Sequence, residues 1–235
     1  MAKLPTNSSR RDVDDFLRKV SDLPVRRTEG ERGRLIFAMD ATMSREPTWD
    51  HACAIQGEMF KETSALGGLD VQLVYYRGFG ECRASRWVSD PRSLLRLMTG
   101  VACRAGHTQI GKVLAHALRE TRKRKVNALV FVGDALEEDV DTLGQTAGEL
   151  GLLGVPVFMF QEGNAGHVRQ AFKEIARLSG GAYSPFDSGS AQQLRELLSA
   201  VAVYAAGGRR ALVEFGRKHG GTAVPRLTGQ IRRSE

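Results

Sequence analysis

Mostly apolar segments without strict alternation predict strands buried on both faces of a sheet. They cover residues 35–39, 69–76, 126–132 and 155–160, with a shorter one around 182–184. Residues 82–88 alternate partly between polar and apolar positions, which indicates an edge strand. This segment follows residues 69–76 after a short Gly-containing turn, so we expect the two to form an antiparallel hairpin.

Between these strands, apolar residues recur at helical spacing. After a short amphipathic helix over residues 9–22, a second helix buries Trp49 to Phe60 and ends before Gly67. Further helices are expected over residues 93–102, from Thr108 to the basic run 119–125, and over residues 137–153, 167–178 and 191–204. Residues 211–215 either extend the last helix or form a separate turn.

Strands and helices therefore alternate along the chain, which predicts an α/β fold. We expect a three-layer, Rossmann-like sandwich with a mostly parallel six-stranded sheet, one antiparallel edge strand and helices on both faces. Three parts are predicted: an amphipathic helix and linker over residues 1–33, the α/β domain over 34–206, and a basic extension over 207–235 in which partial disorder is expected.

The charge distribution supports this division, because the net charge of +7 resides at the two ends. Residues 1–34 carry nine basic and six acidic groups, residues 207–235 seven and two, and residues 35–206 eighteen and nineteen, giving +3, +5 and −1. Such ends can contact an acidic partner or nucleic acid, although solubilising tails are commoner.

The composition points to the cytoplasm. The chain has no apolar run long enough to span a membrane, and its first residues lack the apolar core of a signal peptide. Its three cysteines lack the CxxC spacing of a zinc site and are an odd number, which argues against a disulfide framework and favours a reducing compartment.

Polar oxygen-bearing residues follow three of the elements. Asp40, Thr42 and Ser44 come directly after the first strand, Thr108 opens a helix, and Asp134 follows the strand over 126–132. Ligands of open α/β sheets bind at the carboxyl ends of strands, and oxygen donors suit a hard cation such as Mg²⁺, with Mn²⁺ or Ca²⁺ as alternatives. One of the first three residues could instead be a helix N-cap, but a cap does not require all three.

The order and spacing of these residues resemble the von Willebrand factor type A (vWA) domain and its metal-ion-dependent adhesion site (MIDAS). That site has Asp-x-Ser-x-Ser after the first strand, a Thr before the central helix and an Asp after the fourth strand. Asp40, Thr42, Ser44, Thr108 and Asp134 match it in turn, over a resemblance that spans about residues 34–205. Thr replaces Ser at position 42, and Gly133-Asp134-Ala135 stands where the family often has Thr-Asp-Gly.

The resemblance implies a binding module without catalytic residues. Three neutral hydroxyls leave a bound cation much of its charge and an open position, which an Asp or Glu on a partner protein can fill. Bacterial relatives often act as adaptors in multiprotein complexes or with AAA+ ATPases. His107 and Gly133 are candidates for the rim of the site or for the layer of residues around its metal ligands. His107 could make binding sensitive to pH, although a loop His is more often only a surface residue.

Two other functions are compatible with parts of the sequence. The first resembles that of haloacid dehalogenase phosphohydrolases, because an apolar strand ends in Asp40 and a later strand ends in GDALEED, similar to the first and last motifs of that family. In such an enzyme Asp40 would be the nucleophile. Against it, Thr42 replaces the second acid of the first motif. Nucleic-acid binding through the basic ends and residues 122–125 lacks an aromatic platform. Glu137, Glu138, Asp139 and Asp141 are interpreted as first-turn acids of a helix that stabilise its dipole, not as ligands.

Overall fold

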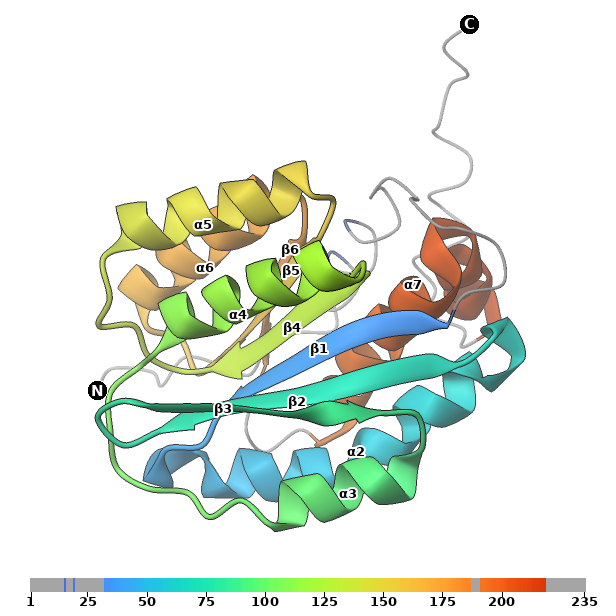
Figure 1. The fold of residues 1–235 in the computed structure, drawn as a ribbon, viewed down its shortest axis with the longest axis horizontal. Coiled ribbons are helices and arrows are strands. Elements are labelled where there is room, and N and C mark those ends of the chain that lie inside the picture. The colour runs from blue at the N-terminus through green and yellow to red at the C-terminus, as the bar shows by residue number, and fades with distance from the viewer. Residues whose placement is uncertain (1–14, 16–18, 20–31, 187–190, 219–235) are drawn as a thin grey trace, which may run out of the picture.

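The computed structural model describes residues 15, 19, 32–186 and 191–218. The predicted helix over residues 9–22 lies outside this part, apart from Asp15 and Lys19. A six-stranded sheet with the order β3-β2-β1-β4-β5-β6 forms the centre of the molecule (Figure 1). Its strands are β1 (Gly33–Asp40), β2 (Leu69–Arg77), β3 (Glu81–Val88), β4 (Ala128–Gly133), β5 (Val157–Glu162) and β6 (Ala182–Phe186). Five strands are parallel, and β3 pairs antiparallel with β2 at one edge.

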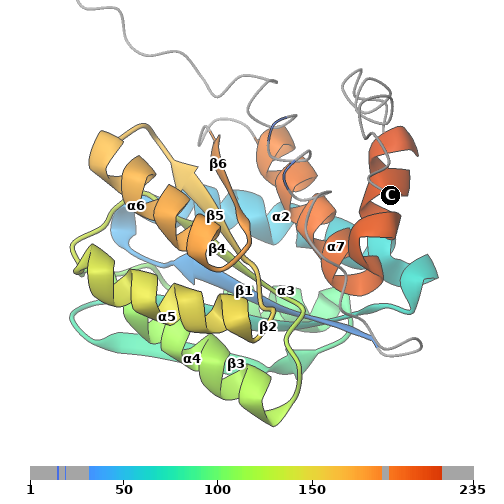
Figure 2. The same cartoon turned by 90° about the horizontal axis from the view of Figure 1, so that it is seen from above.

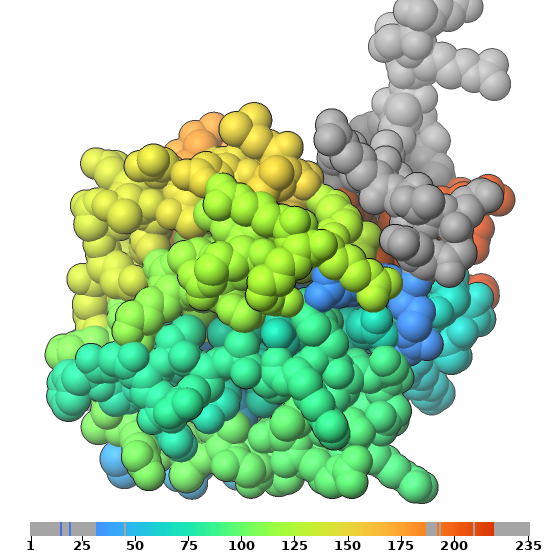
Figure 3. Space-filling view, in the orientation of Figure 1, coloured from blue at the N-terminus to red at the C-terminus, as the bar shows by residue number. Residues whose placement is uncertain are grey.

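Helices cover both faces of the sheet (Figures 1 and 2). One face packs against α2 (Glu46–Thr63), α3 (Pro91–Thr99) and α7 (Ala191–Lys218). The other packs against α4 (Ile110–Lys123), α5 (Val140–Leu152) and α6 (Gly166–Leu178). In the space-filling view of Figure 3, the β2–β3 hairpin and helices α4 and α5 close the face toward the viewer. The predicted three-layer α/β sandwich is confirmed.

The central strand β1 is buried along its whole length. Because successive side chains point to opposite faces, Phe37 contributes to the core beneath α2 and α7, and Ile36 to the core beneath α4 and α5. This explains why the segment reads as a continuous apolar run. The chain leaves β1 for β2 on one side and later enters β4 on the other, so the crevice between β1 and β4 opens at their carboxyl ends. Open α/β sheets bind ligands at such a switch point.

At the opposite end of β1, the chain enters the sheet directly against α7. A Cβ atom added to Gly33 would lie only 2.3 Å from the carbonyl oxygen of Ala205, so only glycine fits this contact. Helix α7 continues beyond residue 206 to Lys218, with a kink at Gly208 (φ 69°), and it buries Ala211 and Leu212. The helical option for residues 211–215 is therefore confirmed.

Several element boundaries differ from those predicted. Helix α4 begins at Ile110 instead of Thr108, and α5 begins at Val140 instead of Glu137. Both differences leave a short loop before the helix, and these two loops carry Thr108 and Asp134 of the candidate site. The three cysteines are free thiols.

Candidate metal site

Asp40 is the last residue of β1, and its side chain is almost completely buried, with 2% of its surface exposed. One carboxylate oxygen accepts a hydrogen bond from the backbone N–H of Thr42 at 2.7 Å. Burial raises the pKa of Asp40 from 3.8 to about 6, hydrogen bonds from Thr42 oppose this rise, and the nearby charge of Asp134 adds to it. A buried carboxylate with so little solvation is a group that a bound cation would stabilise.

Thr42 and Ser44 follow in a tight turn that ends in a 3₁₀ helix, Met43–Arg45. Their hydroxyl oxygens lie 3.4 Å apart. Thr42 occupies the N-cap position of this helix, yet its side chain makes no capping hydrogen bond. Capping therefore does not explain the Thr42 hydroxyl, and both hydroxyls lie within two to four residues of the buried Asp40 carboxylate.

Thr108 reaches the same end of the sheet through the loop that precedes α4. The backbone N–H of Arg104 donates to the Ala41 carbonyl at 2.9 Å, which ties this loop to the end of β1. Thr108 is 7% exposed, and its hydroxyl oxygen accepts a hydrogen bond from the Glu137 N–H at 3.0 Å. A hydroxyl oxygen can accept twice, so one lone pair remains for a cation.

Asp134 follows Gly133, the last residue of β4, which is the neighbour of β1 in the sheet. Asp134 lies close enough to Asp40 to raise its pKa. A Cβ atom added to Gly133 would approach the Phe131 ring to 2.9 Å and the Asp40 Cβ to 3.7 Å. Gly133 therefore lies beside the site, and a side chain at this position would clash with the Phe131 ring.

Glu137 and Glu138 have a role that the sequence interpretation assigned to the wrong helix. Instead of lying in the first turn of α5, their carboxylates accept hydrogen bonds at the N-terminus of α4. Glu137 binds the Thr108 N–H at 2.8 Å, and Glu138 binds the N–H groups of Ile110 and Gly111, the latter at 2.9 Å. Helix α4 has no acid in its own first turn, and this was the available sequence signal for an external cap. In the structure its N-cap residue, Gln109, makes no side-chain capping hydrogen bond.

The other two acids of that run serve α5, as expected. Asp139 is the N-cap of α5 and accepts a hydrogen bond from the Thr142 N–H at 2.9 Å, while Asp141 lies in the first turn. His107 lies at the rim, with Nδ1 3.2 Å from a Glu137 oxygen and its ring 5.0 Å from that of Phe79.

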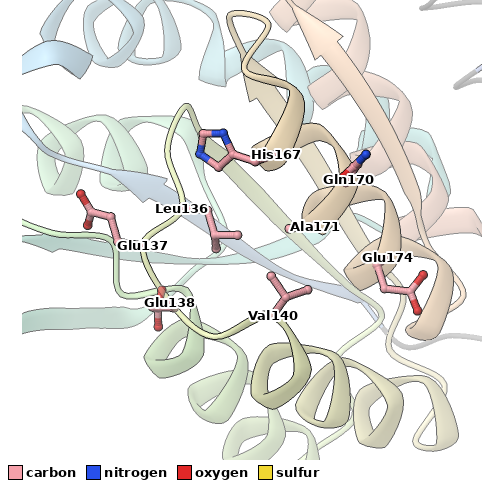
Figure 4. Close-up of a pocket in the computed structure, with 8 residues that line it drawn as sticks. All are labelled: Leu136, Glu137, Glu138, Val140, His167, Gln170, Ala171 and Glu174. Atoms are coloured by element: carbon pink, nitrogen blue, oxygen red, sulfur yellow. The ribbon is translucent and has the colours of Figure 1, made fainter.

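A shallow hollow of about 500 Å³ lies beside these loops, between the start of α5 and helix α6 (Figure 4). Glu137, Glu138, Leu136 and Val140 line it from one side, and residues of α6 face them from the other. Glu137 thus belongs both to this hollow and to the contact with Thr108. The predicted ligands themselves lie outside it.

The donor set at the end of the sheet consists of oxygen atoms only. Two carboxylates, Asp40 and Asp134, and three hydroxyls, on Thr42, Ser44 and Thr108, come from three separate segments that the fold brings to one edge. Within the described residues, no three His, Cys, Asp or Glu side chains gather in a way that could hold a metal ion. A cation here would depend on the hydroxyl oxygens, and such a set suits Mg²⁺, Mn²⁺ or Ca²⁺ better than a soft metal.

The fold is that of vWA domains. No protein-family model and no curated protein sequence matches the chain. Among solved structures, it resembles the SpRpn10 VWA domain with a TM-score of 0.56 and 13% identity, over 72% of this chain and 94% of that domain.

A second neighbour is proximal thread matrix protein 1 from the mussel byssus, solved with a zinc-occupied MIDAS motif. Its TM-score is 0.60 at 13% identity, and the match covers 74% of this chain but only 46% of that protein. A third is the PilB minor pilin of Streptococcus sanguinis, with a TM-score of 0.57 and 10% identity over 83% of this chain and 65% of that one. In the described part of the chain, no helix is both long and apolar enough to cross a bilayer.

Proposed function

We propose that this protein is a metal-dependent protein-binding module that uses a MIDAS-type site. The observation that supports the proposal is that the loops carrying Asp40, Thr42 and Ser44, Thr108 and Asp134 reach the same end of the sheet, next to the switch point between β1 and β4. In this proposal they hold Mg²⁺, or Mn²⁺ or Ca²⁺ in its place. When bound, the ion supplies an electrophilic centre with a position open to an external carboxylate.

The partner is proposed to be a protein that presents an Asp or Glu to the ion. Three neutral hydroxyls, on Thr42, Ser44 and Thr108, accompany the buried Asp40 and the half-buried Asp134, so the bound ion would keep much of its positive charge. The surface around the site is also suited to a protein partner, because Met43 is 66% exposed and Phe79 83% exposed. Exposed apolar side chains beside a charged anchor are typical of protein interfaces.

The hydrogen bonds of the acidic run give no support to the phosphohydrolase alternative. That chemistry needs the acids after β4 to bind Mg²⁺. Here Glu137, Glu138 and Asp139 accept hydrogen bonds from backbone N–H groups at helix starts, and only Asp134 is placed next to Asp40. We therefore propose a binding function without catalysis. Two further expectations stay predictions: a cytoplasmic location, and an adaptor role in a complex with an AAA+ ATPase or in another multiprotein complex.

Calorimetric titration with Mg²⁺ and Mn²⁺ tests the site. Ser44→Ala removes one exposed hydroxyl, and Asp40→Asn keeps the acceptor oxygen for Thr42 while removing the charge. We expect saturable binding by the wild type, clearly weaker binding by Ser44→Ala and none by Asp40→Asn. Glu214→Gln, which removes an exposed acid on α7, should bind like the wild type. Absence of saturable binding by the wild type at millimolar metal would refute the proposal.

The open position can be tested on the same samples with acetate or a short acidic peptide as a carboxylate probe. The probe should bind in the presence of the metal and dissociate when a chelator is added. Equal binding with and without metal would separate the carboxylate contact from the ion and contradict the proposed recognition mode.

A further inference from the structure

Strand β2, the neighbour of β1, carries a buried tyrosine whose side chain lies next to the Asp40 carboxylate of the candidate site. Tyr76 is completely buried near the end of β2. Its ring stacks on Phe131, with centroids 6.1 Å apart and planes 13° apart, and Phe131 packs edge-to-face on Phe172 at 5.6 Å. These contacts fix the ring, so its hydroxyl cannot turn toward solvent.

The Tyr76 hydroxyl has no hydrogen-bond partner among the described residues. Among the described residues, the only other buried side-chain polar atom without a hydrogen-bond partner is Oε1 of Gln56. Buried hydroxyls without a partner are rare, since each costs free energy that a phenylalanine would not. An unsatisfied hydroxyl held in a fixed position therefore calls for a specific explanation.

The group beside this hydroxyl is the Asp40 carboxylate. Asp40 and Tyr76 are register partners on the parallel strands β1 and β2, so their side chains project from the same face of the sheet. The Ala41 N–H donates to the Tyr76 carbonyl at 3.0 Å, which keeps the strands paired to this point. After burial itself, the charge of Asp40 is the largest cause that raises the pKa of Tyr76. The hydroxyl lies close enough to the carboxylate for a hydrogen-bond interaction between them to raise the pKa of Tyr76 further and to lower that of Asp40, but it meets the full distance and angle requirements of a hydrogen bond with no described residue.

We propose that Tyr76 is a positioning residue of the metal site: when a divalent cation is bound, its hydroxyl donates a hydrogen bond to the Asp40 carboxylate and holds that carboxylate oriented for the ion. This inference rests on the proposed metal-binding function. One Asp40 oxygen already accepts from the Thr42 N–H, so the other oxygen is the acceptor for Tyr76 in this proposal. A hydrogen bond to a carboxylate is stronger than one between neutral groups.

Tyr76→Phe tests the inference because it removes only the hydroxyl. We expect at least tenfold weaker Mn²⁺ binding, measured by calorimetry and by the electron paramagnetic resonance signal of free Mn²⁺, since hydrogen-bond partners of metal ligands usually contribute 10- to 100-fold to affinity. Without metal, the urea midpoint of the variant should equal or exceed that of the wild type, because no hydrogen bond is lost.

Tyr183→Phe is the matched control. Tyr183 is also buried, but its hydroxyl donates to Oε1 of Gln161 at 2.7 Å. This variant should show a lower urea midpoint and unchanged Mn²⁺ affinity, the opposite of the pattern expected for Tyr76→Phe.

The outcomes separate this inference from the proposed function. Binding of Mn²⁺ by the wild type and equally by Tyr76→Phe would overturn the role of Tyr76 alone. A lowered urea midpoint of metal-free Tyr76→Phe would show that the hydroxyl already makes a structural contact, and would also overturn it. No binding by the wild type would overturn both proposals.

Discussion

Replacement of Asp40 by Asn should stabilise the metal-free protein. The side chain is 2% exposed, and burial raises its pKa from 3.8 to about 6, which means that the folded state disfavours the ionised form. The stability that Asp40 contributes is therefore complete below pH 3.8 and is lost as the pH rises through about 6. Asn carries no charge at any pH, yet it keeps an oxygen that can accept the hydrogen bond from Thr42.

The size of the effect follows from the same values. Each pKa unit corresponds to about 1.4 kcal/mol, so the difference between 3.8 and about 6 corresponds to roughly 3 kcal/mol above pH 7. At pH 4 the same relation leaves less than about 1 kcal/mol. The advantage of Asp40→Asn over the wild type should therefore appear mainly between pH 4 and 7.

Urea unfolding followed by circular dichroism, with a chelator present, measures this difference at pH 4 and at pH 8. Comparing two variants at each pH cancels the titration of all other groups. Glu214→Gln is the control for loss of an exposed acid and should show little change at either pH. An Asp40→Asn protein that is no more stable than the wild type at pH 8 would refute the reasoning, as would an advantage that does not depend on pH.

Added metal should reduce this difference in stability and, at high enough concentration, reverse it. A ligand at 100 times its dissociation constant stabilises the folded state by about 2.7 kcal/mol. The wild type would gain this free energy and Asp40→Asn would not, so at pH 8 the two unfolding midpoints should converge or cross as metal is added. Protons should also compete with the metal, so that affinity falls as the pH drops below about 6.

Substitutions at three further positions test other contacts of the fold and the site. Glu138→Ala should lower stability by about 1–2 kcal/mol because the start of α4 loses its external cap, whereas Glu138→Gln, which keeps an acceptor, should lose less in the same urea experiment. Gly133→Ala should weaken metal binding, because its methyl group would displace the Phe131 ring; unchanged affinity in a Mn²⁺ titration would contradict this. Thr48→Val should cost about 1.5–3 kcal/mol, since the buried Glu162 loses a hydrogen bond from the Thr48 hydroxyl; thermal melting checks it, and an unchanged melting temperature would argue against a contribution from this bond.

The sequence predicted the sheet well because its signal is local. Residues such as Phe37 and Ile36 face different helix layers, so β1 must be apolar throughout, and no partner needs to be known to recognise it. The five candidate oxygen residues were proposed from the sequence because each follows a strand or precedes a helix, and their role as metal ligands stays a prediction.

The contacts between loops could not be predicted in the same way. The carboxylates of Glu137 and Glu138 cap the start of α4, 27 to 29 residues earlier in the chain, and nothing in the local sequence distinguishes this from capping of their own helix. Tyr76 was likewise part of an apolar strand in the sequence. Only the register between β1 and β2 reveals that its hydroxyl lies beside Asp40.

The contact of Gly33 with Ala205 has a practical consequence for experiments with this protein. The described chain enters β1 and ends in α7 at one pole of the sheet, whereas the ends of β1 and β4 with their oxygen ligands lie at the other (Figures 1 and 2). A fluorophore or surface linkage attached at the described end of α7 therefore lies at the pole opposite the candidate site. The protein can be immobilised through that pole for binding measurements while the candidate site stays accessible.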